Sequence, residues 1–102
     1  MEKDQKRVLG FCERYRMKTI WKYILKFRQN QEITLKKDAQ ILSVQLQNEK
    51  LCLWVLLDTD EVDEMCKIHI IGTGSEIEEK LDYHIGTVQQ GSYVWHIFAE
   101  AI

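Results

Sequence analysis

Short runs in which apolar and polar residues alternate constrain the fold of this chain more than any other feature. Residues 18–27 alternate with a period of two, which is typical of a half-buried β-strand. One side of this run holds Thr19, Trp21, Tyr23, Leu25 and Phe27, and the other holds Lys18, Lys22 and Lys26. Residues 41–47 alternate in the same way. Residues 51–57 are nearly all apolar, which indicates a central strand covered on both faces and puts Trp54 in the core.

Turn residues separate these runs. Asn48-Glu49-Lys50 predicts a tight hairpin between the second and third runs, and Gln90-Gly91 predicts another near the C-terminal end. Further strands are expected over 32–35, 66–71, 83–89 and 92–98. The chain lacks the alternation of strands and long helices that builds a parallel sheet. We therefore predict a mainly β fold, an antiparallel β-sandwich or small open barrel of six to seven strands.

One or two short helices are expected beside the strands. Ser75 followed by Glu78 fits a capping box, which predicts one or two helical turns over 75–81. A short helix around 7–15 is also compatible with the sequence. The character of the chain changes at Met17, which divides it into an N-terminal arm or upstream extension, 1–16, and a single β-rich domain, 17–102.

The composition limits the classes of protein to which the chain can belong. Its 102 residues suffice for one domain, and 45% hydrophobic with 29% charged residues is the balance of a globular protein. A net charge of -2 argues against a protein that coats nucleic acid, so no sequence-specific nucleic acid is expected as a partner. The sequence shows no membrane span and no signal-peptide core. We expect a cytoplasmic protein without a membrane partner.

The residues that could ligate a metal are few and far apart in the sequence. They include three cysteines and three histidines: Cys12, Cys52, Cys66, His69, His84 and His96. The odd number of cysteines without close spacing argues against a disulfide framework or a zinc site and favours reduced thiols. The histidines fall on separate expected strands, so only folding could assemble them. We predict no metal and no cofactor.

A tripeptide recurs in the C-terminal half, where most glycines gather. Ile71-Gly72-Thr73 and Ile85-Gly86-Thr87 each follow the same pattern. The segment Gly72-Thr73-Gly74-Ser75 precedes the expected helix, where backbone N–H groups and the helix dipole favour an anion. The lysine and the spacing of a phosphate-binding P-loop are missing. The segment is therefore either a plain strand-to-helix turn or a ligand loop.

Aromatic residues and a histidine lie close to the glycines in the sequence. Trp21 or Trp95 could stack on a nucleobase, since every base offers a flat face, although a tryptophan in a β-protein usually packs in the core. His96 is either a satisfied structural histidine or a donor to a ligand. The candidate ligand-binding residues are Gly72, Thr73, Gly74, Thr87, Trp21, Tyr93, Trp95 and His96. No nucleophile motif is present, so neither an enzyme nor a catalytic residue is predicted.

Five acidic residues gather in the segment 58–64: Asp58, Asp60, Glu61, Asp63 and Glu64. The ligand order and the central glycine of a calcium loop are absent. We expect a solvated loop here, and a surface that binds a protein partner is the alternative.

From Met17 onward the chain carries, in this order, the segments 17–23 (MKTIWKY), 39–45 (AQILSVQ), 51–54 (LCLW), 71–74 (IGTG), 85–89 (IGTVQ) and 94–98 (VWHIF). Together these segments resemble a family of small uncharacterised proteins encoded by phages and prophages. The resemblance covers 17–102 and implies a setting in the host bacterial cytoplasm, where such proteins often inhibit host defence.

Two functions follow from that setting. The first is sequestration of a nucleotide-derived immune signal by the Gly-Thr segments and their aromatic neighbours. The second is binding of a host defence protein through the acidic loop or an exposed strand edge. Because free strand edges favour self-association and such sites often straddle subunits, we also expect a homo-oligomer.

Overall fold

A computed structural model describes residues 17–101 as seven β-strands that pair antiparallel throughout. The strands are β1 (Lys18–Leu25), β2 (Asn30–Lys36), β3 (Gln40–Gln47), β4 (Lys50–Asp58), β5 (Asp63–Gly72), β6 (Tyr83–Gln90) and β7 (Tyr93–Ala99). Each of them overlaps one of the runs in which the sequence predicts a strand. The predicted mainly β fold is confirmed.

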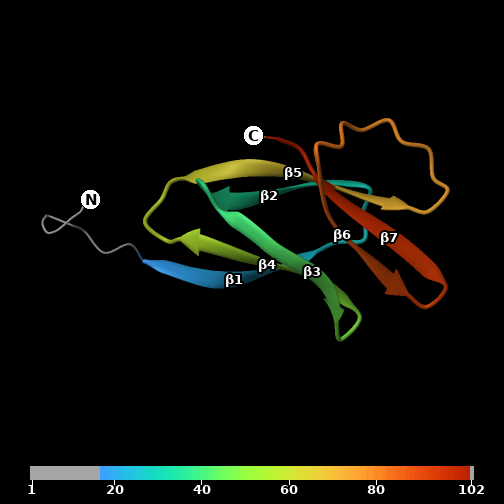
Figure 1. The fold of residues 1–102 in the computed structure, drawn as a ribbon, viewed down its shortest axis with the longest axis horizontal. Helices are drawn as coiled ribbons and strands as arrows, with labels where there is room; N and C mark the ends of the chain where they lie inside the picture. Colours follow the sequence, from blue (N-terminus) through green and yellow to red (C-terminus); the bar gives the residue numbers. More distant parts are fainter. Residues whose placement is uncertain (1–16, 102) are drawn as a thin grey trace, which may run out of the picture.

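The strands form two sheets that pack as the layers of a sandwich and do not close into a barrel (Figure 1). One sheet has three strands in the order β1-β4-β3, and the other has four in the order β2-β5-β7-β6. The chain changes sheet after β1, after β2 and after β4, and then completes the larger sheet with the β6–β7 hairpin. Strands β3 and β6 pack against each other where the two sheets meet along one side.

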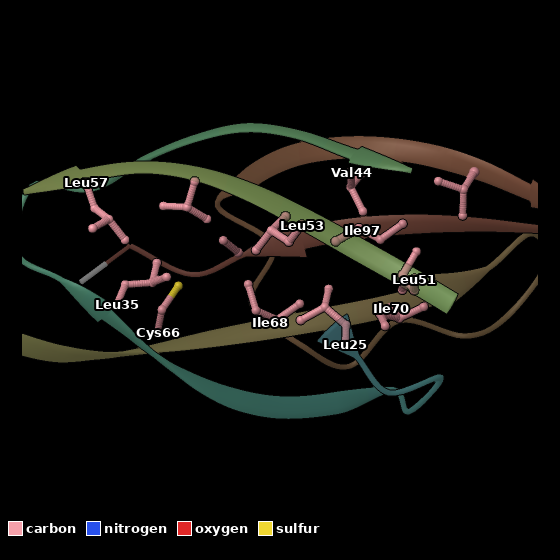
Figure 2. Packing of buried hydrophobic residues seen from close by; sticks show 13 residues of the cluster. Leu25, Leu35, Val44, Leu51, Leu53, Leu57, Cys66, Ile68, Ile70 and Ile97 are labelled. Carbon is pink, nitrogen blue, oxygen red and sulfur yellow. The ribbon is translucent and has the colours of Figure 1, made fainter. Parts of the chain in front are cut away.

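Alternate side chains of each strand fill the space between the sheets. Leu51 and Leu53 of β4, Ile68 of β5 and Ile97 of β7 are each 0% exposed, and Figure 2 shows them facing one another across the core. This is the consequence of the period-two pattern, because successive strand residues point to opposite faces.

The central strand β4 departs from the predicted pattern of burial. Its core-facing residues are buried as expected, but Trp54 and Leu56 are only half-buried. Trp54 pairs with Lys22 of β1 and with Ser43 of β3, on the face directed away from the other sheet. The prediction that Trp54 lies in the core is therefore wrong. An apolar run indicates apolar surroundings, but only the packing of the layers decides which faces are covered.

The predicted hairpin between β3 and β4 is confirmed. Asn48 and Glu49 form its two-residue turn with φ angles of 52° and 65°. Positive φ at both central positions is the signature of the turn whose twist matches antiparallel strands, and asparagine tolerates it well. The β6–β7 hairpin turns at Gly91, with φ 59°, and Ser92.

The predicted helix over 75–81 is wrong: residues 17–101 contain no helix, and hence none that could span a membrane. Gly74 adopts a φ of 90°, and the Ser75 N–H donates to the Gly72 carbonyl, which closes a turn in place of a helix start. A helix this short needs tertiary packing to offset its nucleation cost, and Ile77 remains 55% exposed. The predicted arm 1–16 and its helix around 7–15 lie outside the described residues.

The acidic loop is shorter than the sequence predicts. Strand β5 already begins at Asp63, whose carboxylate lies 2.9 Å from the Lys36 ammonium across the β2–β5 pair. At the other end, buried Asp58 accepts a hydrogen bond from the Asp60 N–H at 2.9 Å. Asp58 and Asp63 therefore serve local structure.

Candidate functional site

The two copies of the repeated tripeptide bring their threonines to the same histidine. Thr73 follows the end of β5 and Thr87 lies on β6, while His96 belongs to β7, which runs between those two strands in the sheet. The Thr73 hydroxyl lies 2.8 Å from Nε2 of His96, and the Thr87 hydroxyl lies 3.1 Å from Nδ1. Both nitrogens of the imidazole therefore have a partner, and the ring is held in a fixed orientation.

The hydrogen bonds at His96 can be assigned a direction. The Thr73 hydroxyl donates to the Val94 carbonyl at 3.4 Å, so it accepts from Nε2–H of His96. Nδ1 of His96 then accepts from the Thr87 hydroxyl, whose oxygen is left to accept from Nε2–H of His84 at 3.1 Å. One consistent chain thus runs from His84 through Thr87, His96 and Thr73 to a backbone carbonyl. We call these four side chains the His-Thr network.

Trp95 lies on the opposite face of β7 from His96, because neighbouring strand residues point to opposite sides. Its ring is stacked with Tyr93 at a centroid distance of 5.8 Å and tilted against Phe27 at 5.9 Å. The indole N–H donates to the Gln90 side chain at 3.1 Å. Gly72 lies beneath the ring, and a Cβ added there would come within 3.3 Å of Trp95. The glycine therefore leaves room for the indole.

A small hollow opens beside Trp95, at the turn that follows β5. Its volume is about 110 Å³, and its lining includes Phe27, Arg28, Gly72, Ser75 and Trp95. Two aromatic residues, an arginine and a serine thus line one site, which we call the Trp95 hollow. Neither Phe27 nor Arg28 is among the site residues that the sequence predicts. An aromatic residue at the end of an alternating run, followed directly by a cation, is the signal that could have found them.

The remaining predicted site residues are spread over the molecule. Trp21 lies on β1 of the other sheet, pairs with Val55 and is 42% exposed, so it shares no strand with Trp95. A Cβ added at Gly74 would meet nothing within 4 Å, and the positive φ of this residue explains why a glycine stands there. The structure therefore divides the eight candidates among two faces of one sheet, a turn and the second sheet.

The Gly-Thr turn uses part of its backbone internally. The Thr73 N–H donates to the Val94 carbonyl at 3.1 Å, and the Ser75 N–H donates to the Gly72 carbonyl at 3.0 Å. Donors already engaged in this way bind an anion only after the turn opens. Arg28 and Ser75, which line the Trp95 hollow, carry side-chain donors of the kind that a phosphate accepts.

His69 is a satisfied structural histidine, unlike the exposed His84. It is 5% exposed, and its Nδ1 and Nε2 lie 2.7 Å from the side-chain oxygens of Asn30 and Glu100. The Gln29 side-chain N–H donates a hydrogen bond at 2.9 Å to the carboxylate of Glu79, which lies in the connection between β5 and β6. Among residues 17–101, no three histidine, cysteine or acidic side chains form a group that could hold a metal ion.

The fold and the site define a small two-sheet β-sandwich with a polar network and an aromatic hollow on opposite faces of its larger sheet. The chain belongs to the family DUF7352, a domain of unknown function. The model of this family matches residues 17–102. Searches of the curated proteins and of the solved structures found no match to this chain.

Proposed function

We propose that this domain is a non-enzymatic binding protein that sequesters a nucleotide-derived signal. The resemblance to phage proteins gives the proposal its setting, the inhibition of a bacterial host's defence. The observation that carries it is the Trp95 hollow, where Phe27, Arg28, Ser75 and Trp95 line one space.

Each group at the hollow suits one part of a nucleotide. A nucleobase stacks on an aromatic ring, and this contact is worth about 1–3 kcal/mol per base. The Arg28 guanidinium offers paired N–H donors that match a phosphate. The hollow, at about 110 Å³, is smaller than a typical small-molecule pocket, so the phosphates and sugar would extend over the neighbouring surface.

Isothermal titration with cyclic di-AMP, cyclic AMP and ADP-ribose tests the proposal. We expect at least one of these probes to bind, and Arg28→Gln to weaken it about tenfold, since a charged hydrogen bond contributes roughly 1.5–3 kcal/mol. Lys37→Gln is the matched control, because it removes a cation from an exposed turn on another part of the sandwich. Binding that is equally tight in both variants would place the ligand elsewhere.

A second pair of substitutions separates the two faces of the sheet. Thr73→Ala combined with Thr87→Ala removes both hydroxyls from His96, while the Trp95 hollow keeps its lining. A ligand in the hollow should be little affected. If the threonine variant loses binding and Arg28→Gln does not, the His-Thr network is the binding surface instead.

The exposed strand β1 favours a second candidate, the binding of a host defence protein. Ile20 and Ile24 are 54% and 57% exposed on this edge strand. An apolar strand with a free edge can pair with a strand of a partner. Ile20→Lys with Ile24→Lys should then abolish the capture of a protein that wild type retains from defence-active bacteria, whereas nucleotide binding should persist.

A further inference from the structure

A second cavity lies between the sheets, and His84 of the His-Thr network is one of its lining residues. Its volume is about 360 Å³, within the range of small-molecule sites. Its apolar lining comes from several strands and their connecting segments, and includes Leu35, Ala39, Ile41, Cys66, Ile85 and Ala99. It shares no lining residue with the Trp95 hollow.

The backbone is irregular on both sides of this cavity. The pairing of β3 with β4 shifts register between Ile41 and Ser43, and the pairing of β6 with β7 shifts between His84 and Gly86. Bulges bend a strand and redirect its side chains, and they are frequent beside functional sites. Because Ile41 and Ile85 lie at the two bulges and both line the cavity, the irregularities open the sandwich at this point.

Small side chains leave the space unfilled. Ala39, Ala99 and Ala101 line the cavity, and Ala99 is a core residue only 5% exposed. A well-packed interior fills such positions with larger side chains. The cavity therefore exists because three separate positions of its lining carry alanine.

The polar residues of the lining, Tyr83, His84 and Glu100, indicate what the cavity accepts. Tyr83 and Glu100 both line it, and Glu100 also accepts from His69 at 2.7 Å. A carboxylate has two oxygens and accepts several hydrogen bonds, so it can receive another from a ligand. We propose that this cavity binds a small, mainly apolar molecule that carries one hydrogen-bond donor.

Cys66 allows the proposal to be tested without knowing the natural ligand. Its thiol lies next to Leu35 at one end of the core (Figure 2) and lines the cavity. Cys52 is an internal control, because it is buried to a similar degree, 1% against 3%, and does not line the cavity. Unfolding exposes both thiols alike, whereas a small reagent that enters the cavity reaches only Cys66.

The experiment measures modification of each cysteine by methyl methanethiosulfonate in a Cys12→Ser background, with mass spectrometry of the peptides. We expect Cys66 to react about tenfold faster than Cys52, since access controls the reactivity of buried thiols. Burial, and next the Glu100 carboxylate, raise the pKa of Cys66. This slows its reaction, so faster labelling must come from access.

Indole serves as the ligand probe. It should protect Cys66 in a saturable manner and leave Cys52 unaffected. 1-Methylindole lacks the N–H donor and should need about fivefold higher concentration, the effect of one ordinary hydrogen bond. Equal labelling of the two cysteines, or labelling of Cys66 that indole does not slow, would overturn the proposal. Equal protection by both probes would overturn the assignment of the donor.

A cavity-filling variant gives an independent check. Ala39→Leu adds bulk at the lining and should remove both the fast labelling and the protection by indole. Thr34→Leu also introduces a leucine, at an exposed position of β2 outside the cavity, and should leave both unchanged. Retained protection in a folded Ala39→Leu protein contradicts the proposal. If that variant does not fold, the wild-type indole experiment still decides.

Discussion

The two copies of Ile-Gly-Thr are identical in sequence and differ in what surrounds them. In the first copy, Gly72 lies under Trp95 and beside Ser75, and a Cβ added there would come within 3.3 Å of each. In the second, Gly86 faces Val44 of the opposite sheet, and a Cβ there would come within 2.7 Å of a Val44 methyl group. Only the second glycine is thus required for the two sheets to meet.

The threonines of the two copies behave alike because of strand order. Strands β5 and β6 flank β7, so one threonine reaches each side of His96. The threonines of the repeated motif thus share one role, whereas the glycines have separate roles. The difference depends on which residues of the neighbouring strands lie beside each position.

The largest expected effect comes from Gly86→Ala. The new methyl group must displace Val44, and overpacking of this kind costs about 1–3 kcal/mol. Urea denaturation should show this loss in the free energy of unfolding.

Adding Val44→Ala to Gly86→Ala tests the cause. Because the two residues touch, the double variant should be more stable than the sum of the single losses predicts. Strict additivity would show that the methyl group clashes with something other than Val44.

Gly72→Ala should cost less, between about 0 and 1 kcal/mol. The contacts of 3.3 Å require only a small movement of Trp95 and Ser75. Alanine also reduces the conformational entropy of the unfolded chain, which stabilises the folded state by about 0.4–1 kcal/mol and partly offsets the cost. Tryptophan fluorescence should shift, since Trp95 moves. A loss as large as that of Gly86→Ala would remove the contrast between the two copies.

The threonines should differ in the same sense, with the second copy again the more costly to change, and with effects smaller than that of Gly86→Ala. Thr87 contacts both His84 and His96, whereas Thr73 contacts His96 and a backbone carbonyl. Thr87→Val should lower the free energy of unfolding by roughly 0.5–1 kcal/mol and Thr73→Val by less, because these exposed hydrogen bonds compete with water. Thermal denaturation of the two variants side by side measures the difference.

The direction of the hydrogen bonds in the His-Thr network predicts the tautomer of each histidine. This prediction concerns the position of a proton and involves no change in the free energy of unfolding. When neutral, both His84 and His96 should hold their proton on Nε2. Nitrogen-15 NMR of the imidazole rings distinguishes the two tautomers. Thr87→Val should perturb Nδ1 of His96, and a proton found on Nδ1 in wild type would reverse the assigned chain.

Local sequence was sufficient for much of the fold. The alternation in β1 and β3 and the Asn48-Glu49 turn fix strands and a hairpin through interactions between near neighbours. The helix over 75–81 failed because its capping signal is short, and the turn at Gly74 prevailed. Trp54 was misplaced because an apolar run does not say how many layers cover it.

The candidate site was predictable only in part. The Gly-Thr segments and His96 do come together, since neighbouring strands bring them into register. Trp21 is separated from Trp95 because β1 joins the other sheet, a choice that no local pattern encodes. Arg28 and the alanine-lined cavity were missed, because their significance depends on residues distant in the sequence.

The sequence by itself determined the strands of this protein, their turns and the concentration of polar and aromatic groups near its glycines. These follow from backbone preferences and from the period-two alternation, which act over a few residues. Only the tertiary structure decided the strand order, the close approach of Gly86 to Val44 and the separation of Trp21 from Trp95. Those features depend on which sheet each strand joins and on the volumes that meet between the layers, and both are properties of the whole chain.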